Sequence, residues 1–534
     1  MSLRLGLDFD NTVIRYDAVF ARLARRRGWL KGRPAATKDA VKALLLAEDG
    51  HDLRWQALQA EAYGREILSA TFFPGCLDFL RRAKAAGHEV FIVSHKSKTS
   101  HFDPSVKLRE AALLWLKRRA KGLIAPANVR FAADRAEKVR MIAHLDLDLF
   151  VDDLPEVLEH PAFPKDTARL HFSARPSRLP RAARWSEVRA AVDDMAALGP
   201  AAYRAVERTT GERPARVERG ARQGNNRPLK VTLASGAKLL VKRYLVDARD
   251  RRERGRVEFR ALTLLWDNGI RRIPQPLYLD PNGEFALLSW IDGRDLRKKG
   301  AGRAQVLQAA AFIKRLAGLR PGSYPEAADS RRCLGDYARH IERRLSRVRE
   351  GAAELKGFPQ ARRFVAETVV PLKERLLARF FVETDLQGLD LEAPLPASQR
   401  ILSPSDFGFH NALEDAKGRM HFLDFEYFGQ DDPAKLACDF SHHVAQSVSP
   451  ENRRRFVSQL AASLPDHELF LRRVDLVYDL VGLEWLLIVL NVFAPETRAR
   501  RRFADPGVSE NALLKKRLAV ARRLAAALER EHRP

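Results

Sequence analysis

The chain has 534 residues, which is too long for one ordinary domain and predicts two to four. Hydrophobic residues make up 46% of it and charged residues 30%, a balance typical of folded, soluble proteins that argues against disorder. The net charge of +26 would suit a nucleic-acid partner. The arginines, however, are interleaved with acids and no nucleic-acid-binding motif accompanies them, so we expect no such partner.

The cysteines and the N-terminus indicate a compartment. Cys76, Cys333 and Cys438 contain no CxxC pair, which argues against a disulfide framework or a zinc site and fits a reducing environment. The N-terminus runs straight into a predicted strand, with no basic-then-apolar secretion signal before it. We therefore expect a cytoplasmic protein.

The first predicted strand ends in two acidic residues. Residues 3–7 form a short apolar run, and Asp8-Phe9-Asp10 follows it. Strand alternation points Asp8 and Asp10 to the same side, at the carboxyl end of the strand, where α/β sheets place their sites. Carboxylates this close repel each other, and a bound cation with a phosphate group would relieve that repulsion.

Further polar residues follow other predicted strands or begin a helix in the same part of the chain. They are Ser94 after the strand 89–93, Lys138 at the start of a helix, and Asp152 and Asp153 after the strand 149–151. A hydroxyl binds a phosphoryl oxygen, a lysine neutralises developing charge, and the carboxylates suit Mg²⁺. Four such groups in this order favour a phosphoryl-transfer site.

This set of residues resembles the four motifs of the haloacid dehalogenase-like (HAD) phosphatase superfamily, over about residues 3–164. The resemblance implies an α/β Rossmannoid domain in which Asp8 is the nucleophile that forms an aspartyl-phosphate and Asp10 is the general acid/base. It also implies that Ser94 and Lys138 bind the phosphoryl group. The implied Mg²⁺ ligands are Asp8, Asp10, Asp152 and, as a weaker candidate, Asp153.

A helical insertion and a composition change complete the first predicted domain. The Ala-, Leu- and Arg-rich stretch of about residues 13–73 predicts a small helical cap that closes over a modest substrate. His95, Lys96 and Lys98 either meet an anionic substrate or, as we expect, are solvated loop residues. Proline-rich sequence then places the end of the domain at about residue 196, with the boundary near Gly199.

The second predicted domain begins at about residue 200 with features of a nucleotide site. Gly220 and Gly224 lie in a turn between two strand-like runs, a weak signal taken alone. Lys242 ends an apolar strand, and Glu258 lies on the inward face of the next predicted helix, with Glu253 as the alternative. A strand lysine paired with a helix glutamate holds nucleotide phosphates in kinase folds.

The stretch 401–426 supplies the remaining parts of such a site. Asp406 and Asn411 stand five positions apart, and a short hydrophobic strand then leads to Asp424. One carboxylate would orient or deprotonate an attacking hydroxyl, while a carboxamide and a second carboxylate would hold Mg²⁺ over the nucleotide phosphates.

This stretch resembles the aminoglycoside phosphotransferase and choline kinase-like family of small-molecule kinases, over about residues 211–440. In the family the loop reads HGDxxxxN before a D-x-E/D strand, and here Pro404 and Ser405 replace the His and Gly. The resemblance implies an α+β bilobal protein-kinase-like domain, with an N-lobe at 200–291 and a C-lobe at 292–534. It implies ATP bound by Gly220, Gly224, Lys242 and Glu258, the base Asp406, and Mg²⁺ on Asn411 and Asp424. The segment from Asp431 to Asp439 is similar to a structural DP-x-x-D segment of the family.

The most apolar run of the chain lies near its end. Residues 480–493 are interrupted by Glu484 and are too short to span a bilayer, so we expect a buried helix and no membrane partner.

Together these features predict a bifunctional phosphatase and kinase that acts on a small-molecule phosphate ester and a hydroxyl acceptor. A sugar of nucleotide-sugar or cell-envelope metabolism is the expected substrate class, and the oligomeric state stays open. One alternative is a HAD phosphatase with a nucleotide-binding pseudokinase domain, which the missing His-Gly favours. Another is a nucleic-acid end-processing enzyme, which the absence of a P-loop GxxxxGK[ST] opposes.

Overall fold

The computed structural model describes residues 2–30, 37–47, 52–220, 227–244, 253–296, 300–319, 322–446, 448–495, 497–498 and 509–530. The chain divides into two compact units, one of residues 1–218 with 231–238 and the other of residues 219–230 with 239–534. Gly199, near the predicted domain boundary, separates the consecutive helices α8 (Trp185–Leu198) and α9 (Pro200–Thr210) inside the first unit. The predicted limits of the two domains, residues 1–196 and 200–534, stay predictions.

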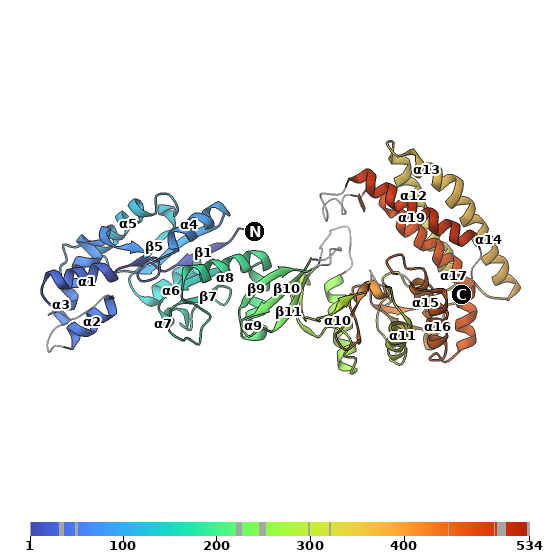
Figure 1. Cartoon of the computed structure of the whole chain (residues 1–534), viewed down its shortest axis with the longest axis horizontal. Coiled ribbons are helices and arrows are strands. Elements are labelled where there is room, and N and C mark those ends of the chain that lie inside the picture. Colours follow the sequence, from blue (N-terminus) through green and yellow to red (C-terminus); the bar gives the residue numbers. More distant parts are fainter. Residues whose placement is uncertain are drawn as a thin grey trace. The chain divides into compact units, whose positions relative to one another are not determined.

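A six-stranded sheet with parallel pairing forms the centre of the first unit (Figure 1). Its order is β5 (Val129–Ala132), β4 (Glu89–His95), β1 (Arg4–Leu7), β6 (Leu149–Asp152), β7 (Ala168–Phe172) and β8 (Arg181–Ala182). The inner strands are nearly continuous buried apolar runs, as expected where helices cover both faces of a parallel sheet. Because β4 and β6 pair with opposite edges of β1, the strand order changes sides there, and the carboxyl ends of these three parallel strands lie at the position where open α/β sheets place their sites.

Helices connect these strands. They are α4 (Cys76–Ala85), α5 (Leu108–Arg119), α6 (Arg135–His144) and the short α7 (Pro155–Leu158), besides α8 and α9. Helix α6 begins three positions before Lys138, where we predicted its start, because the side chain of Asp134 accepts a hydrogen bond from the backbone N–H of Glu137 and caps the helix.

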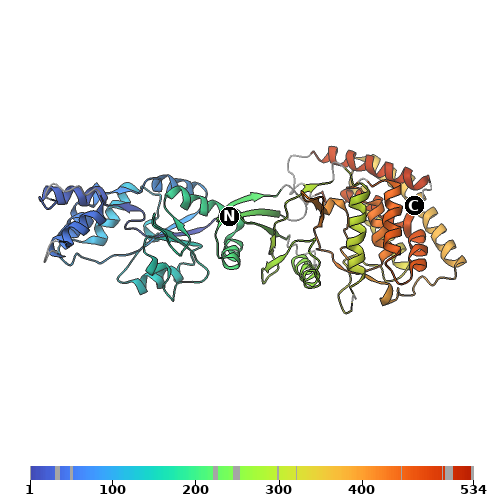
Figure 2. The same cartoon turned by 60° about the horizontal axis from the view of Figure 1, so that its bottom comes forward.

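The insertion after β1 is helical, as predicted, although its function as a cap stays a prediction. It contains β2 (Ile14–Arg15), α1 (Asp17–Arg26), α2 (Lys38–Leu46), α3 (Asp52–Ala60), a π-helical turn (Glu61–Arg65), a 3-10 turn (Ile67–Ser69) and β3 (Thr71–Phe72). Strands β2 and β3 pair antiparallel and close the insertion at its base. The helices lie together (Figures 1 and 2) and pack through Tyr16, Phe20, Trp55 and Tyr63, whose neighbouring ring centroids are 4.7 to 6.4 Å apart.

A second sheet follows along the chain. Its order is β12 (Pro276–Leu279), β13 (Phe285–Ser289), β11 (Lys238–Arg243), β10 (Arg227–Leu233) and β9 (Pro214–Arg219), with antiparallel pairing of β13 to both β11 and β12. Helix α10 (Arg254–Asp267) packs on β12 and β13 through its buried apolar face, which includes Ala261, Leu262 and Leu265. That amphipathic pattern turns Glu258 inward as well, because it lies on the same face three and four positions before two of these residues.

Beyond those strands of this sheet that belong to it, the second unit is mainly helical. Its helices are α11 (Arg303–Ala317), α12 (Gly335–Glu354), α13 (Pro359–Phe364), α14 (Val370–Leu386), α15 (Pro433–His442), α16 (Pro450–Ala461), α17 (His467–Leu490) and α19 (Glu510–Glu529), with a π-helical turn at Val365–Val369 and 3-10 turns at Ala397–Gln399, Phe409–Asn411 and Asn491–Phe493. Short strands β14 (Arg294–Asp295), β16 (Ala412–Glu414) and β17 (Met420–Phe422) form one small sheet, and β15 (Ile401–Ser403) pairs with β18 (Gly429–Asp431).

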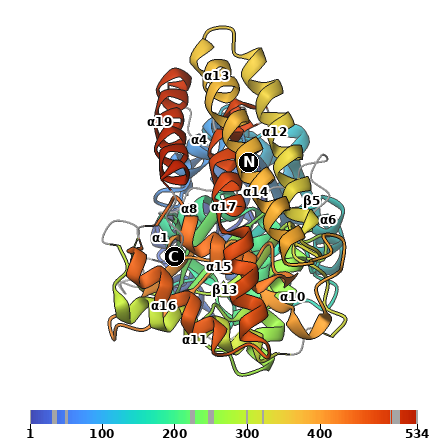
Figure 3. The same ribbon diagram turned by 90° about the vertical axis from the view of Figure 1, so that its right-hand side faces the viewer.

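Helix α17 forms the core of this helical part. It packs against α12, α14, α15 and α19, several of which run beside it in Figure 3. Within the described residues, the segment His467–Phe493 is the one helix long and apolar enough to cross a membrane by length and composition, and 78% of its most apolar stretch is buried inside the protein. The predicted buried helix is confirmed. The argument that the run is too short was wrong, because the helix begins well before Leu480.

Charged side chains form a network inside this core. Both oxygens of Glu484 on α17 accept hydrogen bonds from arginines, 2.5 Å from Arg331 and 2.7 Å from Arg344 on α12. The other members are Asp432 with Arg473, and Lys435 with Asp431 and Asp439 at 3.2 and 3.0 Å. Four carboxylates thus face four cations, so that little net charge is buried. The segment from Asp431 to Asp439, predicted to be structural, belongs to this network.

Removing one carboxylate from this network should destabilise the second unit strongly. Glu484→Gln would leave the fully buried guanidinium of Arg331 without its ionic partner, a change that costs about 3–5 kcal/mol. Glu367→Gln is the matched control, because Glu367 and its partner Arg363 are both exposed and 3.9 Å apart, so we expect no measurable change. The urea midpoint of unfolding, monitored through hydrogen exchange of the α15 and α17 backbone amides, measures the stability of both variants. Equal midpoints for the two variants would refute the expectation.

Candidate functional sites

The first candidate site lies at the carboxyl ends of β1, β4 and β6. The ammonium of Lys138, on α6, donates hydrogen bonds to Asp8 Oδ1 at 2.5 Å and to Asp152 Oδ2 at 2.7 Å, and all three side chains are buried. Ser94 is buried near the end of β4, the strand that pairs with β1. The structure therefore brings Asp8, Lys138 and Asp152 together from segments up to 144 positions apart in the sequence.

Negative charge exceeds positive charge in this first candidate site. Burial and the charges of Asp152 and Asp10 outweigh the opposing charge of Lys138 and together raise the pKa of Asp8 to about 7. Burial, together with the charges of Asp8 and Asp152, raises the pKa of Asp153 to about 8. Ligand oxygens of Asp8, Asp152 and Asp153 lie within 4.8 Å of one another. An oxygen-only set with this excess of charge fits Mg²⁺, which would be held by these carboxylates.

Asp10 has partners of its own. Its Oδ1 accepts a hydrogen bond from the Tyr16 hydroxyl at 2.6 Å, and its Oδ2 accepts one from the Lys96 ammonium at 2.7 Å. We expected Lys96 to be a solvated loop residue, and this was wrong: its side chain is 3% exposed, because Asp10 compensates its charge in a buried place. His95 and Lys98 are exposed, as expected.

The helical insertion also reaches this site. The ammonium of Lys38, at the start of α2, donates to Asn11 Oδ1 at 3.2 Å, and the amide of Asn11 donates to Asp153 at 3.3 Å. Asn11 adopts φ 60°, a left-handed conformation that asparagine tolerates better than most residues. The ring centroid of Tyr63, from the π-helical turn, lies 5.1 Å from the Lys96 ammonium. Sequence analysis missed Lys38, Tyr63 and Tyr16, because no spacing rule links an insertion to the strand ends that it covers.

The second candidate site begins with a buried lysine on β11. The Lys242 ammonium lies 2.6 Å from Glu258 Oε2 on α10 and 2.7 Å from Asp424 Oδ1, after β17. The other oxygen of Glu258 accepts the backbone N–H of Phe425 at 3.2 Å. Burial opposes the charge of Lys242, but Asp424 and Glu258 outweigh it and raise the pKa of the ammonium. The predicted pairing with Glu258 is formed, whereas the alternative, Glu253, is exposed and contacts Arg256 at 3.3 Å.

The loop around Asp406 turns through strained backbone. Ser405 adopts φ 66°, a left-handed conformation in which glycine is the usual residue, and Asp424 adopts φ 69°. Such conformations cost about 1 kcal/mol or more each and gather at functional sites. The hydroxyl of Ser403 accepts the backbone N–H of Ser405 at 3.0 Å, which supports the turn. Serine therefore makes the turn at the position where the family has glycine.

Asp406 and Asn411 lie together in this loop. The Asn411 amide donates to the backbone carbonyl of Asp406 at 3.1 Å, and its nitrogen is 3.4 Å from Asp406 Oδ2. The backbone N–H of Leu423 donates to the Asn411 carbonyl at 2.8 Å, which places Asn411 beside the segment that carries Asp424. A carboxamide oxygen and a carboxylate are ligands that Mg²⁺ accepts, so Asn411 and Asp424 fit the predicted metal position.

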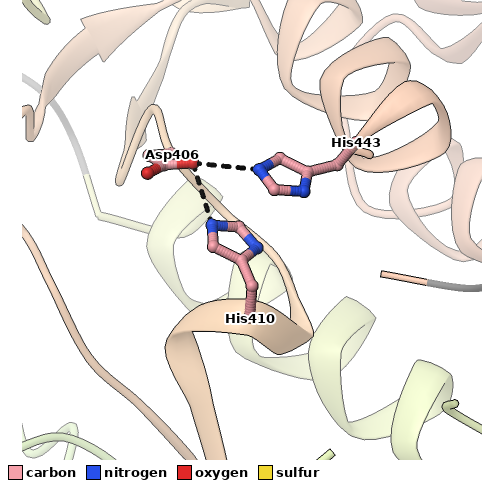
Figure 4. A group of neighbouring side chains, drawn as sticks. All are labelled: Asp406, His410 and His443. Carbon is pink, nitrogen blue, oxygen red and sulfur yellow. Dashed lines mark hydrogen bonds and ion pairs between the residues drawn. The ribbon is translucent and has the colours of Figure 1, made fainter. Parts of the chain in front are cut away.

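Two histidines contact Asp406 (Figure 4). His410 Nε2 lies 3.0 Å and His443 Nε2 3.4 Å from Asp406 Oδ1. Burial alone would raise the pKa of Asp406, but the hydrogen bonds from His410 and His443 outweigh it and hold that pKa well below its usual range. Sequence analysis missed both histidines. His410 lies inside the loop motif, four positions after Asp406, but His443 is 37 positions away with no pattern that links it to the loop.

The predicted glycine turn is only partly described. Gly220 donates its backbone N–H to the Pro228 carbonyl at 2.9 Å, and a side chain there would meet Pro228 at 3.1 Å. Gly224 lies outside the described residues. The role of both glycines in nucleotide binding stays a prediction.

Comparisons with known proteins give matches among solved structures. No family model and no curated protein matches the sequence. A spectinomycin phosphotransferase in complex with ADP and spectinomycin is 12% identical, with a TM-score of 0.43, over 62% of this chain and 98% of that one. A Plasmodium vivax ethanolamine kinase is 14% identical, with a TM-score of 0.37, over 57% of this chain and 80% of that one. A Streptococcus pneumoniae choline kinase is 17% identical, with a TM-score of 0.37, over 59% of this chain and 94% of that one.

Small-molecule kinases are thus similar to about 60% of the chain. At these identities and with TM-scores below 0.5, the likeness decides neither the fold nor the activity. Both are argued from the residues of this chain.

The charge excess of the first site leads to a test with the metal alone. Millimolar Mg²⁺ should raise the unfolding temperature of the first unit, because a ligand at 100 times its Kd adds about 2.7 kcal/mol of stability. Asp152→Asn should lose most of this shift. Asp166→Asn, which removes an exposed carboxylate paired with Arg208, should keep it. Calorimetry measures the shift, and the expectation fails if both variants respond alike or the wild type does not respond.

Proposed function

We propose that this chain is a bifunctional enzyme, with an Mg²⁺-dependent phosphatase in the first unit and an ATP-dependent small-molecule kinase in the second. One observation carries the proposal for both units: each gathers a buried lysine between two carboxylates at the end of a strand.

In the phosphatase, a carboxylate oxygen of Asp8 would attack phosphorus and expel the alcohol, forming an acyl phosphate that water then hydrolyses. Asp10 would give a proton to the leaving oxygen and take one from the water, since Tyr16 and Lys96 hold its side chain in place. Lys138 contacts Asp8 and would stabilise charge on the phosphoryl oxygens. Mg²⁺ would neutralise charge at the carboxylates of Asp8, Asp152 and Asp153 and thereby favour the ionised nucleophile.

In the kinase, Lys242 would bind nucleotide phosphates while Glu258 fixes its ammonium. Asp406 would accept the proton of the acceptor hydroxyl, and its depressed pKa keeps it ionised for that purpose. Asn411 and Asp424 would hold Mg²⁺, which neutralises charge on the phosphates. This proposal is supported by the convergence of Lys242, Glu258 and Asp424 from three separate elements.

A phosphorylated sugar is the substrate class that we favour for the pair of activities. A kinase that phosphorylates one hydroxyl and a phosphatase that clears another would together move a phosphate between positions of one molecule. The net charge of +26 would repel a polycationic acceptor such as an aminoglycoside and suits an anionic one. We place both activities in the cytoplasm, which supplies ATP and in which the buried free thiols of Cys76, Cys333 and Cys438 would persist.

The second candidate function is a phosphatase with a pseudokinase unit that binds nucleotide without transfer. Two features favour it: Pro404 and Ser405 replace the His-Gly of the family loop, and Asp406 is already hydrogen-bonded to two imidazoles. The retained Lys242, Asp406, Asn411 and Asp424 oppose it, because a unit that only binds nucleotide has no need of the base Asp406.

The phosphatase proposal is tested at the nucleophile. Asp8→Asn should abolish Mg²⁺-dependent hydrolysis of an aryl phosphate and leave ATP consumption by the second unit unchanged. Asp406→Asn, measured in the same assay, should keep full hydrolysis. Undiminished hydrolysis by purified Asp8→Asn protein would place the nucleophile elsewhere.

The kinase proposal is tested by separating binding from transfer. Asp424→Ala should weaken Mg-ATP binding and transfer together, because Asp424 contacts Lys242 and would hold the metal. Asp406→Ala should bind Mg-ATP like the wild type and lose transfer by about 10² or more. Calorimetric titration beside a transfer assay on a panel of free and phosphorylated sugars measures both. Tight nucleotide binding without transfer to any acceptor would support the pseudokinase instead.

A further inference from the structure

Two imidazole rings hold one oxygen of Asp406 from different segments of the second unit (Figure 4). Both Nε2 atoms point to Oδ1, at 3.0 Å for His410 and 3.4 Å for His443. The rings stack with centroids 3.7 Å apart and planes 8° from parallel. His410 belongs to the loop itself, whereas His443 follows the last residue of α15. The loop is thus tied to the helical core through the side chain of Asp406.

The geometry defines His443 as the hydrogen-bond donor. Its Nδ1 accepts the backbone N–H of Ala445 at 3.1 Å, so a neutral ring carries its proton on Nε2 and donates it to Asp406. The ring is buried and stands edge-on to the indole of Trp485, with centroids 4.3 Å apart. The indole N–H in turn donates to Asp439 at 2.9 Å. Packing and hydrogen bonds therefore fix the direction of this donor.

The same segment also fixes the backbone of the loop. The side-chain oxygen of Gln446 accepts the N–H of Phe409 at 2.7 Å, while its amide donates to the Phe440 carbonyl at 2.7 Å. At Gly408 an added side chain would approach that oxygen to 2.5 Å and His410 Nδ1 to 2.9 Å, so the loop lies tightly against both. Residues 440–446 therefore hold the loop as well as the carboxylate.

This arrangement leaves the two oxygens of Asp406 in different situations. Oδ1 is shared by both histidines, whereas among the described residues Oδ2 has only the amide of Asn411, at 3.4 Å. The Asp406 side chain is 38% exposed, so an acceptor hydroxyl can reach it. We infer that His410 and His443 are positioning residues that turn Oδ2 of Asp406 toward the acceptor hydroxyl. This inference rests on the proposed kinase function.

A transition-metal ion is the other occupant that an Asp–His–His set suggests. The lone pair of an imidazole nitrogen lies in the ring plane, so a bound ion lies near that plane, about 2.0 Å from the nitrogen. An ion between parallel rings 3.7 Å apart would lie far out of both planes. The proton on His443 Nε2 also occupies the position that the ion would need. Hydrogen bonding to the carboxylate explains the geometry better.

The test separates the donor from the ring at position 443 in the full chain. His443→Phe keeps a ring without a donor, and His443→Gln keeps an amide donor without a ring. His442→Phe is the matched control, because His442 is the preceding residue and its ring packs against Tyr478 instead, with centroids 4.2 Å apart. Each variant is measured for phosphate transfer to the acceptor that the panel identifies and for Mg-ATP binding by calorimetry.

We expect His443→Phe to lose about 10- to 100-fold in kcat with an unchanged Kd for Mg-ATP, since a small displacement of a base has effects of this size. His443→Gln should recover most of the loss, and His442→Phe should transfer like the wild type. In an Asp406→Asn background, His443→Phe should cause no further loss, because both changes remove the same function. His410→Gln and His410→Phe should repeat this contrast for the loop histidine.

The outcomes distinguish this inference from the proposed function. If the wild type transfers phosphate and His443→Phe retains its kcat, the inference is overturned while the kinase proposal stands. A wild type that transfers phosphate to no acceptor overturns both. Transfer that phenanthroline abolishes and Zn²⁺ restores, with Mg²⁺ present throughout, would assign the three side chains to a metal and overturn the positioning role.

Discussion

A buried ammonium between two carboxylates is the interaction on which both sites depend. Lys138 joins Asp8 to Asp152, and Lys242 joins Glu258 to Asp424. An ammonium without a partner in such a place would cost several kcal/mol, so the chain must bring both carboxylates to it. The lysine thereby fixes the ends of separate strands and helices relative to one another.

The two sites differ in how their charge is balanced. In the first, burial and, to a smaller extent, neighbouring carboxylates raise the pKa of Asp8 and Asp153, a setting that a divalent ion would suit. In the second, hydrogen bonds from His410 and His443 outweigh burial, stabilise the ionised form of the proposed base and lower its pKa. The proposed nucleophile, which would act with a bound metal, and the proposed base, which must stay ionised, would require these opposite settings. The electrostatics therefore agree with two different reactions on one chain.

Sequence patterns predict those parts of both sites that lie at the ends of regular elements. Asp8 and Asp152 follow buried apolar strands, and Glu258 lies on the apolar face of an amphipathic helix, so local periodicity indicates their direction. Lys96 was assigned wrongly because a lysine in a loop is usually solvated, and only the folded chain places Asp10 beside it. His443 and Lys38 were missed because their contacts depend on how distant segments pack, for which a single sequence carries no periodic signal.

Helix α15 connects the buried charge network to the second site. Its N-terminus is capped by Asp432, which accepts the N–H of Ala434 and pairs with Arg473. Lys435, on its first turn, joins Asp431 to Asp439, and the residue after its last turn is His443. Because buried ion pairs tolerate little displacement, this network fixes the axis and rotation of α15. The direction in which His443 approaches Asp406 is therefore set by charges that contact neither of them, so that the stability of the core and the geometry of the proposed base depend on the same helix.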